Sequence, residues 1–317
     1  MLDYQLANIQ TIAADWLVYK DAYLEILRLD KIHPVVSGNK WFKLKYYLEE
    51  AKKNNQGLVT FGGAWSNHIV AVAYCCQQAG IKCTGIIRGE KPKKLSQTLL
   101  SAMGYGMNLQ FVNREEYGVV KNEQRIVNNE QRTMKNEERE IKNEKRETRN
   151  GSYFIPEGGY GVLGVKGAAE IGNLYDLSSY THIIAGVGTG TMLAGLILSA
   201  KPHQKIIGIS SMKGNDNSGE EVKQLLLPKT GLPNFQIIHD YHFGGFGKHP
   251  QVLINFMNGV FEKHELPLDI VYTGKTFYAI KDLVEKNFFP KGSKILMIHS
   301  GGLQGNKSVG AKLKFQS

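Results

Sequence analysis

Short runs rich in β-branched residues alternate with longer stretches of helical spacing, and this alternation limits the fold more than any other feature. The strands predicted from it are Leu24–Leu27, Leu58–Phe61, Cys83–Ile87, Leu109–Val112, His182–Ala185, Lys205–Ile209, Asp269–Tyr272 and Ile295–Ile298. The predicted helices are Trp41–Asn54, Asn67–Ala79, Lys94–Met103, Met192–Ala200 and Thr276–Lys286. Alternation of this kind is typical of α/β proteins with mostly parallel sheets and helices on both faces. At 317 residues the chain has room for one or two such domains.

One segment does not follow this pattern. Four near-copies of a seven-residue unit begin at Val120, Val127, Met134 and Ile141. One apolar residue per heptad is too few for a coiled coil, which needs two. We interpret 119–150 as a low-complexity surface insertion, partly helical or disordered, with a partner-binding helix as the alternative. Its removal should leave the chemistry intact.

Composition excludes several classes of function. The net charge is +10, but none of the known nucleic-acid motifs is present, so we expect no nucleic-acid partner. The uncharged stretch Ile183–Ala200 contains four glycines, which favours a buried strand, loop and helix over a membrane span. The N-terminus does not resemble a signal peptide. Cys75, Cys76 and Cys83 lack metal-site spacing, which indicates buried thiols in a reducing cytoplasm and no bound metal.

Lys40 follows a Ser-Gly-Asn turn and stands at the predicted start of a helix. The helix dipole disfavours positive charge at this end and lowers the pKa of a lysine there. A lysine that forms a Schiff base needs such a lowered pKa. A solvated lysine after a surface turn is the alternative, and the tetrapeptide alone does not decide between them.

Two glycine-rich loops join predicted strands to helices. The first, Gly62–His68, ends in a Ser-Asn pair that either caps the helix or binds a carboxylate. The second, Gly186–Thr191, resembles a phosphate-binding loop, although it lacks the Gly-Lys-Ser/Thr of a P-loop. Val271–Lys275 and Ile298–Gly302 place further polar groups at strand ends, where open α/β sheets bind ligands.

Taken in order, these five stretches resemble the 1-aminocyclopropane-1-carboxylate deaminase and D-cysteine desulfhydrase family over nearly the whole chain outside the insertion. The resemblance implies a fold type II enzyme similar to the tryptophan synthase β chain, with two open, twisted, mostly parallel sheets. It implies a large domain of residues 1–45 and 154–317 and a small domain of 46–153. It also implies a pyridoxal 5'-phosphate cofactor, a small amino-acid substrate and a homodimer.

The resemblance also implies roles for particular residues. Lys40 matches the Schiff-base lysine, Ser66 a nucleophile that contacts the substrate carboxylate, and Tyr272 an active-site tyrosine. The other expected cofactor contacts are Lys43, Asn67, Gly188, Thr189, Gly190, Thr191 and Thr273. Asn67 and Ser66, with His68 and Phe246, are the residues expected to bind the substrate. Thr273 falls where the family contacts the pyridine nitrogen.

Two positions depart from the deaminase pattern. Thr273 stands where the deaminases have glutamate, and a neutral side chain makes the cofactor a weaker electron sink. Phe246 stands where the family usually has a tyrosine, so a hydroxyl is missing. Both departures favour a D-cysteine desulfhydrase-like elimination that yields pyruvate, ammonia and sulfide. The alternatives are deamination of 1-aminocyclopropane-1-carboxylate to 2-oxobutyrate, and a non-catalytic pyridoxal-phosphate-binding protein.

Overall fold

The computed structural model describes residues 3–120, 152–227, 229 and 231–315. The chain divides into two compact units. Unit 1 comprises Met1–Asn39 and Ala168–Ser317, and unit 2 comprises Lys40–Gly167. These units are defined by contacts, so the predicted limits of independently folding domains, 1–45 with 154–317 and 46–153, remain a prediction. The heptad segment lies outside the described residues from 121 onward.

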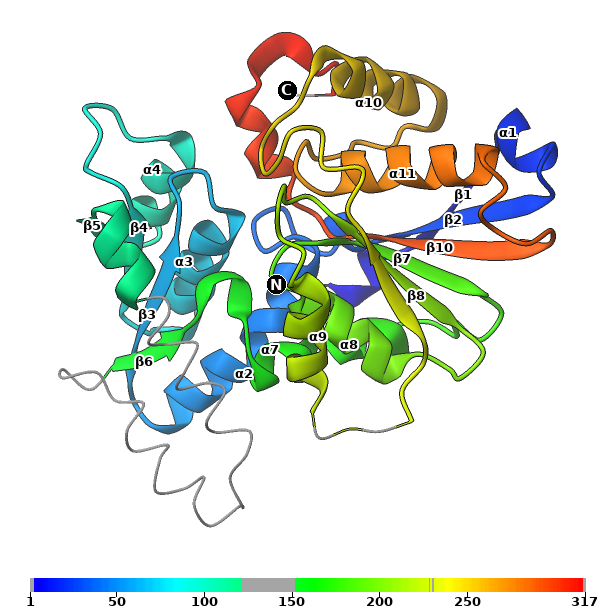
Figure 1. Ribbon diagram of the computed structural model, residues 1–317. Coiled ribbons are helices and arrows are strands. Elements are labelled where there is room, and N and C mark those ends of the chain that lie inside the picture. The colour runs from blue at the N-terminus through cyan, green and yellow to red at the C-terminus, as the bar shows by residue number, and fades with distance from the viewer. Residues whose placement is uncertain (1–2, 121–151, 228, 230, 316–317) are drawn as a thin grey trace. The chain divides into compact units, whose positions relative to one another are not determined.

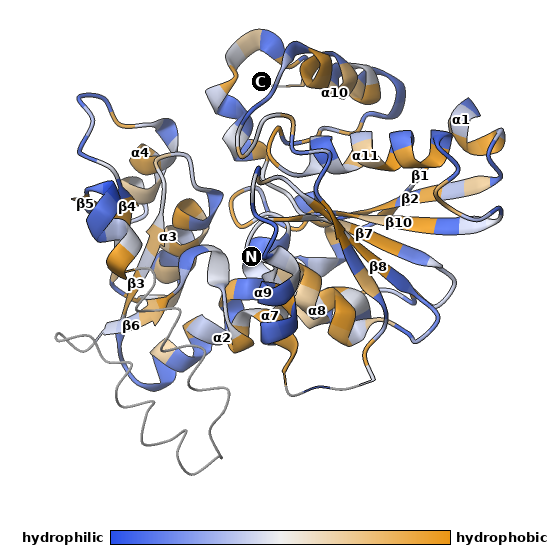
Figure 2. Ribbon diagram, viewed as in Figure 1, coloured by the Kyte–Doolittle hydropathy of each residue, from blue (hydrophilic) through white to orange (hydrophobic). Residues whose placement is uncertain are grey.

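Unit 1 is built on a six-stranded sheet in the order β1-β2-β10-β7-β8-β9 (Figure 1). Its strands are β1 Ile9–Ile12, β2 Ala22–Arg28, β7 His182–Val187, β8 Lys205–Ser210, β9 Phe235–Ile238 and β10 Ser293–His299. Each neighbouring pair is parallel except β1 with β2. The central strands β7, β8 and β10 are almost continuously apolar (Figure 2) because both of their faces are covered.

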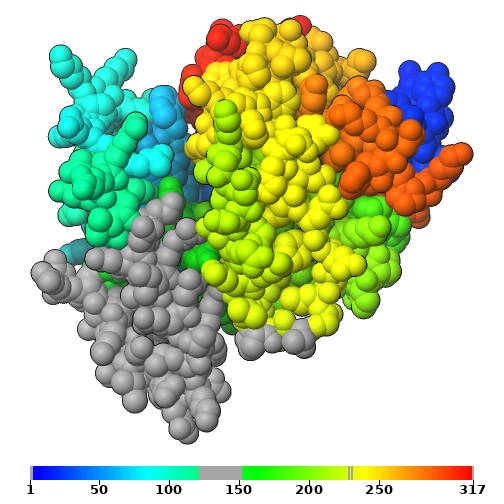
Figure 3. Space-filling view, in the orientation of Figure 1, coloured from blue at the N-terminus to red at the C-terminus, as the bar shows by residue number. Residues whose placement is uncertain are grey.

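Helices cover both faces of this sheet (Figure 1). On one face lie α8 Thr191–Ser199 and α9 Ser218–Leu226, and on the other lie α10 Gln251–His264 and α11 Thr273–Glu285. The short helix α1 is Asp15–Val18. The yellow surface in Figure 3 belongs to residues around 240–260, which form part of the outside of unit 1. Unit 1 therefore has the two-faced architecture that the alternating pattern predicts.

Unit 2 contains a four-stranded, wholly parallel sheet in the order β5-β4-β3-β6. Its strands are β3 Gly57–Gly62, β4 Cys83–Arg88, β5 Asn108–Val112 and β6 Ser152–Ile155. Its helices include α2, which begins at Asn39 and ends at Lys53, α3 Asn67–Ala79, α4 Gln97–Gly104 and α7 Val162–Ala169. The three cysteines are buried and free, as predicted.

Short 3-10 helices complete the described structure. They are η1 Tyr4–Leu6, η2 Leu29–Lys31, η4 Glu157–Gly159, η5 Glu170–Asn173, η6 Leu303–Ser308 and η7 Gly310–Lys312. Within the described ranges, none of the helices combines the length and apolar character needed to span a bilayer. Over the same residues, no group of three or more His, Cys, Asp or Glu side chains is arranged to hold a metal.

The prediction of a strand at Asp269–Tyr272 is wrong. The carboxylate of Asp269 accepts hydrogen bonds from the backbone N–H groups of Val271, Tyr272 and Thr273, at 2.7–3.0 Å. These bonds turn the chain directly into α11, which starts at Thr273, three residues before the predicted start. The β-branched pattern of the segment therefore gives way to a turn that is held by an aspartate side chain.

Candidate functional site

The loop between β7 and α8 has the form of an anion-binding site. The residue before α8 is Gly190, whose φ of 75° is in the left-handed region, and no side chain caps the helix. A Cβ at Gly190 would lie 2.7 Å from the Cγ2 of Val222, so glycine is required on steric grounds too. The hydroxyls of Thr189 and Thr191 are 3.0 Å apart at the same place. An uncapped helix start with hydroxyls beside it suits a phosphate.

Tyr272 packs directly on this loop. A Cβ at Gly188 would lie 2.7 Å from the Tyr272 hydroxyl oxygen, and a Cβ at Gly186 would lie 2.9 Å from the Tyr272 Cβ. The Tyr272 ring also meets the ring of Phe246 edge-on, with centroids 6.0 Å apart. Phe246 is 54% exposed, so it is the outer member of the pair. Unit 1 thus brings together the predicted phosphate loop, Tyr272 and Phe246.

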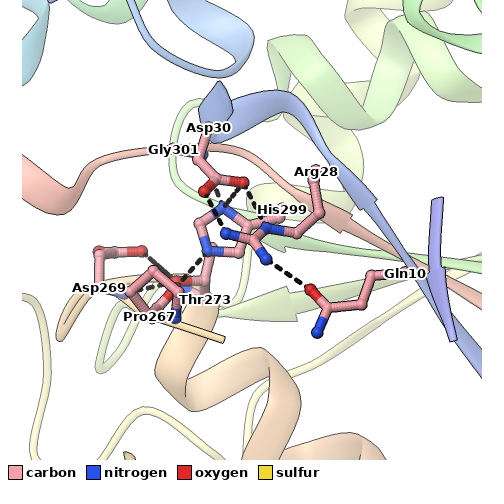
Figure 4. A network of polar contacts seen from close by, with 8 residues as sticks. All are labelled: Gln10, Arg28, Asp30, Pro267, Asp269, Thr273, His299 and Gly301. Carbon is pink, nitrogen blue, oxygen red and sulfur yellow. Dashed lines mark hydrogen bonds and ion pairs between the residues drawn. The ribbon is translucent and has the colours of Figure 1, made fainter. Parts of the chain in front are cut away.

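Thr273 is buried, and its hydroxyl already has two partners (Figure 4). The Oγ1 donates to the Asp269 Oδ1 at 2.8 Å and accepts from the Asp269 backbone N–H at 2.6 Å. A threonine hydroxyl has one proton, and here that proton is directed to a carboxylate. Toward a pyridine nitrogen, Thr273 could therefore act only as an acceptor in this arrangement. Its predicted contact with that nitrogen remains a prediction.

Lys275 anchors the loop that carries Phe246. Its Nζ donates to the carbonyl oxygens of His242 and Gly245, each at 2.8 Å. Burial lowers the pKa of Lys275 to about 8, although the nearby Asp269 acts in the opposite direction. Lys275 belongs to the Val271–Lys275 motif, but its role could not be predicted from the sequence, because nothing there shows that two carbonyl groups 30 and 33 residues away face it.

Unit 2 holds the other predicted residues, beginning with Lys40 and Lys43 on the first turns of α2. Lys43 is buried, and burial, together with the charge of Lys40, lowers its pKa well below the ordinary value. Among the described residues no carboxylate forms an ion pair with Lys43. A buried cation without a carboxylate partner is a suitable place for an anionic ligand.

Ser66 stands at the N-cap of α3, directly after β3 and its glycines. Its hydroxyl makes no capping hydrogen bond. A Cβ at Gly62 would lie 2.9 Å from the Ser66 Oγ and 2.6 Å from the Ile69 Cγ1, so glycine lets the start of α3 close on the end of β3. Asn67 is the first residue of the helix. The serine therefore presents a hydroxyl that makes no capping hydrogen bond, at the N-terminus of a helix, which suits a carboxylate.

His68 points into unit 2 and is 3% exposed. Its Nε2 is 2.8 Å from the hydroxyl oxygen of Thr60, which itself donates to the carbonyl oxygen of Ile155 at 2.9 Å. Because the single hydroxyl proton goes to Ile155, the proton between Thr60 and His68 must belong to Nε2. The Nδ1 is then an acceptor, and no described group donates to it. Burial, followed by the charges of Lys43 and Lys40, lowers the pKa of His68 well below its usual value.

Comparison with known proteins relates the predicted site residues of unit 1 and those of unit 2 to one protein family. The family model for pyridoxal-phosphate dependent enzymes matches residues 23–301, which include every predicted site residue. The chain belongs to this family. The predicted cofactor, pyridoxal 5'-phosphate, and the predicted fold of two mostly parallel sheets are confirmed.

Several family members are similar along most of their length. A Thermotoga maritima protein provisionally named 1-aminocyclopropane-1-carboxylate deaminase is 31% identical over 296 residues, covering 88% of each chain. The bifunctional D-cysteine desulfhydrase/1-aminocyclopropane-1-carboxylate deaminase of Arabidopsis thaliana is 27% identical over 294 residues, covering 85% of this chain and 70% of the relative. The crystal structure of a 1-aminocyclopropane-1-carboxylate (ACC) deaminase homologue has a TM-score of 0.73 at 27% identity, covering 95% and 90% of the two chains.

The residues present fit the family's cofactor, which carries a phosphate and an aldehyde. The uncapped start of α8 with its two threonine hydroxyls suits the phosphate. Lys43, buried and without a described carboxylate partner, suits a nearby anion, and the acceptor Nδ1 of His68 suits a proton donor. Lys40 is the lysine predicted to bind the aldehyde, and this role remains a prediction. Asn39, immediately before it, is the last residue of the first segment of unit 1.

Proposed function

We propose that the protein is a pyridoxal-phosphate-dependent lyase that eliminates the β-substituent of a small amino acid, with D-cysteine as the leading substrate. The products would be pyruvate, ammonia and hydrogen sulfide, formed with uptake of one water molecule. The two relatives named above support a lyase or deaminase of this kind. We propose that both sets of predicted residues serve one cofactor, with a homodimer as the assembly and the cytoplasm as the location.

The observation that carries the choice of substrate is the environment of Thr273. The pyridine nitrogen of a bound cofactor is held protonated most strongly by a carboxylate. Thr273 offers one remaining lone pair. The neighbouring Asp269 cannot replace the missing glutamate, because its two oxygens already accept four hydrogen bonds from Val271, Tyr272 and Thr273. A weaker electron sink suits loss of a thiolate better than the opening of a carbon ring.

The residues would divide the work as follows. Lys40 would supply the amine that takes the proton from Cα of the bound amino acid. Ser66 and the backbone N–H groups at the start of α3 hold the substrate carboxylate. The start of α8 holds the phosphate. Tyr272, which packs against Gly186 and Gly188, would orient the substrate or act as an acid toward the leaving sulfur. The cofactor, when bound, accepts the electron pair left at Cα.

A product assay tests this proposal. Purified protein loaded with cofactor is given D-cysteine, L-cysteine and 1-aminocyclopropane-1-carboxylate in separate reactions, and pyruvate, 2-oxobutyrate and sulfide are quantified. We expect pyruvate and sulfide in equal amounts from D-cysteine and no 2-oxobutyrate. The variant Lys40→Ala should bind the cofactor without covalent attachment and form neither product.

Two other outcomes would contradict the proposal. Formation of 2-oxobutyrate as the main product would overturn the argument from Thr273 and identify a 1-aminocyclopropane-1-carboxylate deaminase, the activity for which the relatives are named. A protein that holds the cofactor on Lys40 but whose visible absorbance is unchanged by any D- or L-amino acid would be a non-catalytic binding protein.

A further inference from the structure

The motif His299–Gly302 at the end of β10 has no role in the proposed reaction, yet its histidine is completely buried. The Nε2 of His299 is 2.7 Å from the carbonyl oxygen of Pro267 (Figure 4). A carbonyl oxygen only accepts, so Nε2 carries a proton. The Nδ1 lies 3.2 Å from the Oδ1 of Asp30 and 3.3 Å from the backbone N of Gly301.

Asp30 is itself part of a buried ion pair. Its carboxylate receives two hydrogen bonds from Arg28, from Nε to Oδ1 at 2.8 Å and from Nη2 to Oδ2 at 2.7 Å. Both side chains are at most 5% exposed. Burial by itself would raise the pKa of Asp30, but His299 and Arg28 outweigh this effect and lower it. Asp30 is therefore an ionised carboxylate beside the ring of His299.

The two contacts of Nδ1 require opposite protonation states. An unprotonated Nδ1 could accept from the N–H of Gly301, but its lone pair would then face a charged oxygen of Asp30 at 3.2 Å. A protonated Nδ1 donates to that oxygen in a charge-assisted bond. In a buried place the attraction to a carboxylate is stronger than a hydrogen bond to a neutral amide. Among the described residues, the charged group that pairs with this ring is Asp30, which Arg28 also binds, and Pro267 and Gly301 contribute backbone groups.

The segments that this cluster joins are the ones that hold the turn before Lys40. The N–H of Gly38 donates to the carbonyl of Leu29, next to Asp30, at 2.9 Å. The N–H of Asn39 donates to the carbonyl of Ser300, next to His299, at 3.2 Å. Gly38 has a φ of 66°, and a Cβ there would lie 1.9 Å from the Ser300 carbonyl oxygen. The turn 37–39 is therefore held between the two segments that Asp30 and His299 connect.

We propose that Arg28, Asp30 and His299 form a positioning clamp in which a proton on the Nδ1 of His299 ties β10 to η2 and so holds the 37–39 turn that places Lys40. This inference rests on the proposed role of Lys40 as the cofactor lysine. His299 acts through the turn and touches neither cofactor nor substrate in this scheme, so it is a positioning residue.

Two substitutions by amide side chains distinguish the roles of the two ring nitrogens of His299. The amide nitrogen of His299→Asn replaces Nδ1 and keeps the bond to Asp30, whereas that of His299→Gln replaces Nε2 and keeps the bond to Pro267. Two measurements are made on each variant. Hydrogen exchange follows the amides of Gly38 and Asn39, and visible absorbance follows covalent attachment of pyridoxal 5'-phosphate to Lys40 in the cofactor-free protein. The exposed His203→Gln, in the same unit, is the matched control.

We expect His299→Gln to speed exchange of the two amides by about tenfold and to slow cofactor attachment by about tenfold, because small displacements of a reacting group carry such rate penalties. His299→Asn should stay within about threefold of the parent protein in both measurements, and His203→Gln should match the parent. Nitrogen NMR of the parent protein should show both ring nitrogens of His299 protonated.

Three results would overturn the clamp. They are an unprotonated Nδ1 in the NMR spectrum, equal effects of the Asn and Gln variants, and unchanged exchange in His299→Gln. If His299→Gln does not fold, the NMR spectrum and the behaviour of His299→Asn decide. Failure of the parent protein to attach the cofactor at Lys40 would refute the proposed function, while exchange and NMR would still judge the clamp.

Discussion

His68 shows at the scale of a single residue how neighbours fix a chemical state. Its Nε2 must hold a proton because Thr60 has given its own to Ile155, and its Nδ1 is left as a buried acceptor. Burial lowers the pKa of His68, and the charges of Lys43 and Lys40 on α2 lower it further. A histidine in this state stays neutral in the folded protein at mildly acidic pH, whereas in the unfolded chain it takes up a proton near pH 6.5.

This difference predicts a pH dependence of stability. Below pH 6.5 the unfolded chain binds one more proton at His68 than the folded protein, so the free energy of unfolding falls as the pH falls. The variant His68→Gln keeps an amide donor toward Thr60 and does not titrate. Between pH 7 and pH 5 it should lose less stability than the parent, by up to about 2 kcal/mol.

Urea unfolding at the two pH values measures this effect. The surface variant His203→Gln should lose as much stability as the parent between pH 7 and pH 5, because it leaves the buried ring of His68 unchanged. An equal loss in the parent and in His68→Gln would mean that His68 is protonated in the folded protein as readily as in the unfolded one.

At the scale of elements, the junction of β7 with α8 depends on glycines for two different reasons. Gly190 is needed both for its left-handed backbone and for the closeness of Val222. Gly188 is needed because Tyr272 lies where its side chain would be. The same element therefore sets the geometry of the predicted phosphate loop and the position of Tyr272.

The variant Gly188→Ala tests this coupling. Its Cβ would lie 2.7 Å from the Tyr272 hydroxyl oxygen, so the tyrosine or the loop must move. We expect cofactor affinity to fall by about tenfold or more, which corresponds to about 1.4 kcal/mol. Fluorescence titration of the cofactor-free protein with pyridoxal 5'-phosphate measures it.

Gly219→Ala is the matched control, because Gly219 lies in helix α9 and a Cβ there meets no atom within 4 Å. This variant should bind the cofactor like the parent and be slightly more stable, since alanine is the better helix former. Unchanged affinity in Gly188→Ala would show that the loop and Tyr272 are not coupled.

At the scale of the whole molecule, the heptad segment should be separable from the chemistry. Three of its four repeating units have one apolar residue in seven, too few to build a buried face. Replacing 121–150 with a short Gly/Ser linker should leave kcat on D-cysteine and the melting temperature within about twofold and a few degrees of the parent values. Loss of activity in a protein that remains folded and loaded with cofactor would assign the segment a role in the reaction.

Sequence patterns predicted most strands of both sheets and the parallel character of the fold, because hydrophobic periodicity reports on burial directly. They also identified the two glycine-rich loops, since a loop that brings backbone close to a ligand needs glycine at a recognisable spacing. Strands β1, β6 and β9 and helices α1, α7, α9 and α10 were missed. The three strands are edge strands of four residues, too short for a periodic signal.

The sequence by itself thus determined the fold class, the cofactor and the loops that can bind an anion, since these depend on local residue order and on family motifs. Only the tertiary structure decided the protonation of His68, the turn held by Asp269, the anchoring of the Phe246 loop by Lys275 and the contact of His299 with Asp30. Each of these depends on a partner that folding brings close. The position of a proton, or the availability of a carboxylate for a ligand, depends on which groups lie beside it in the folded protein. The order of residues does not show which distant groups these are.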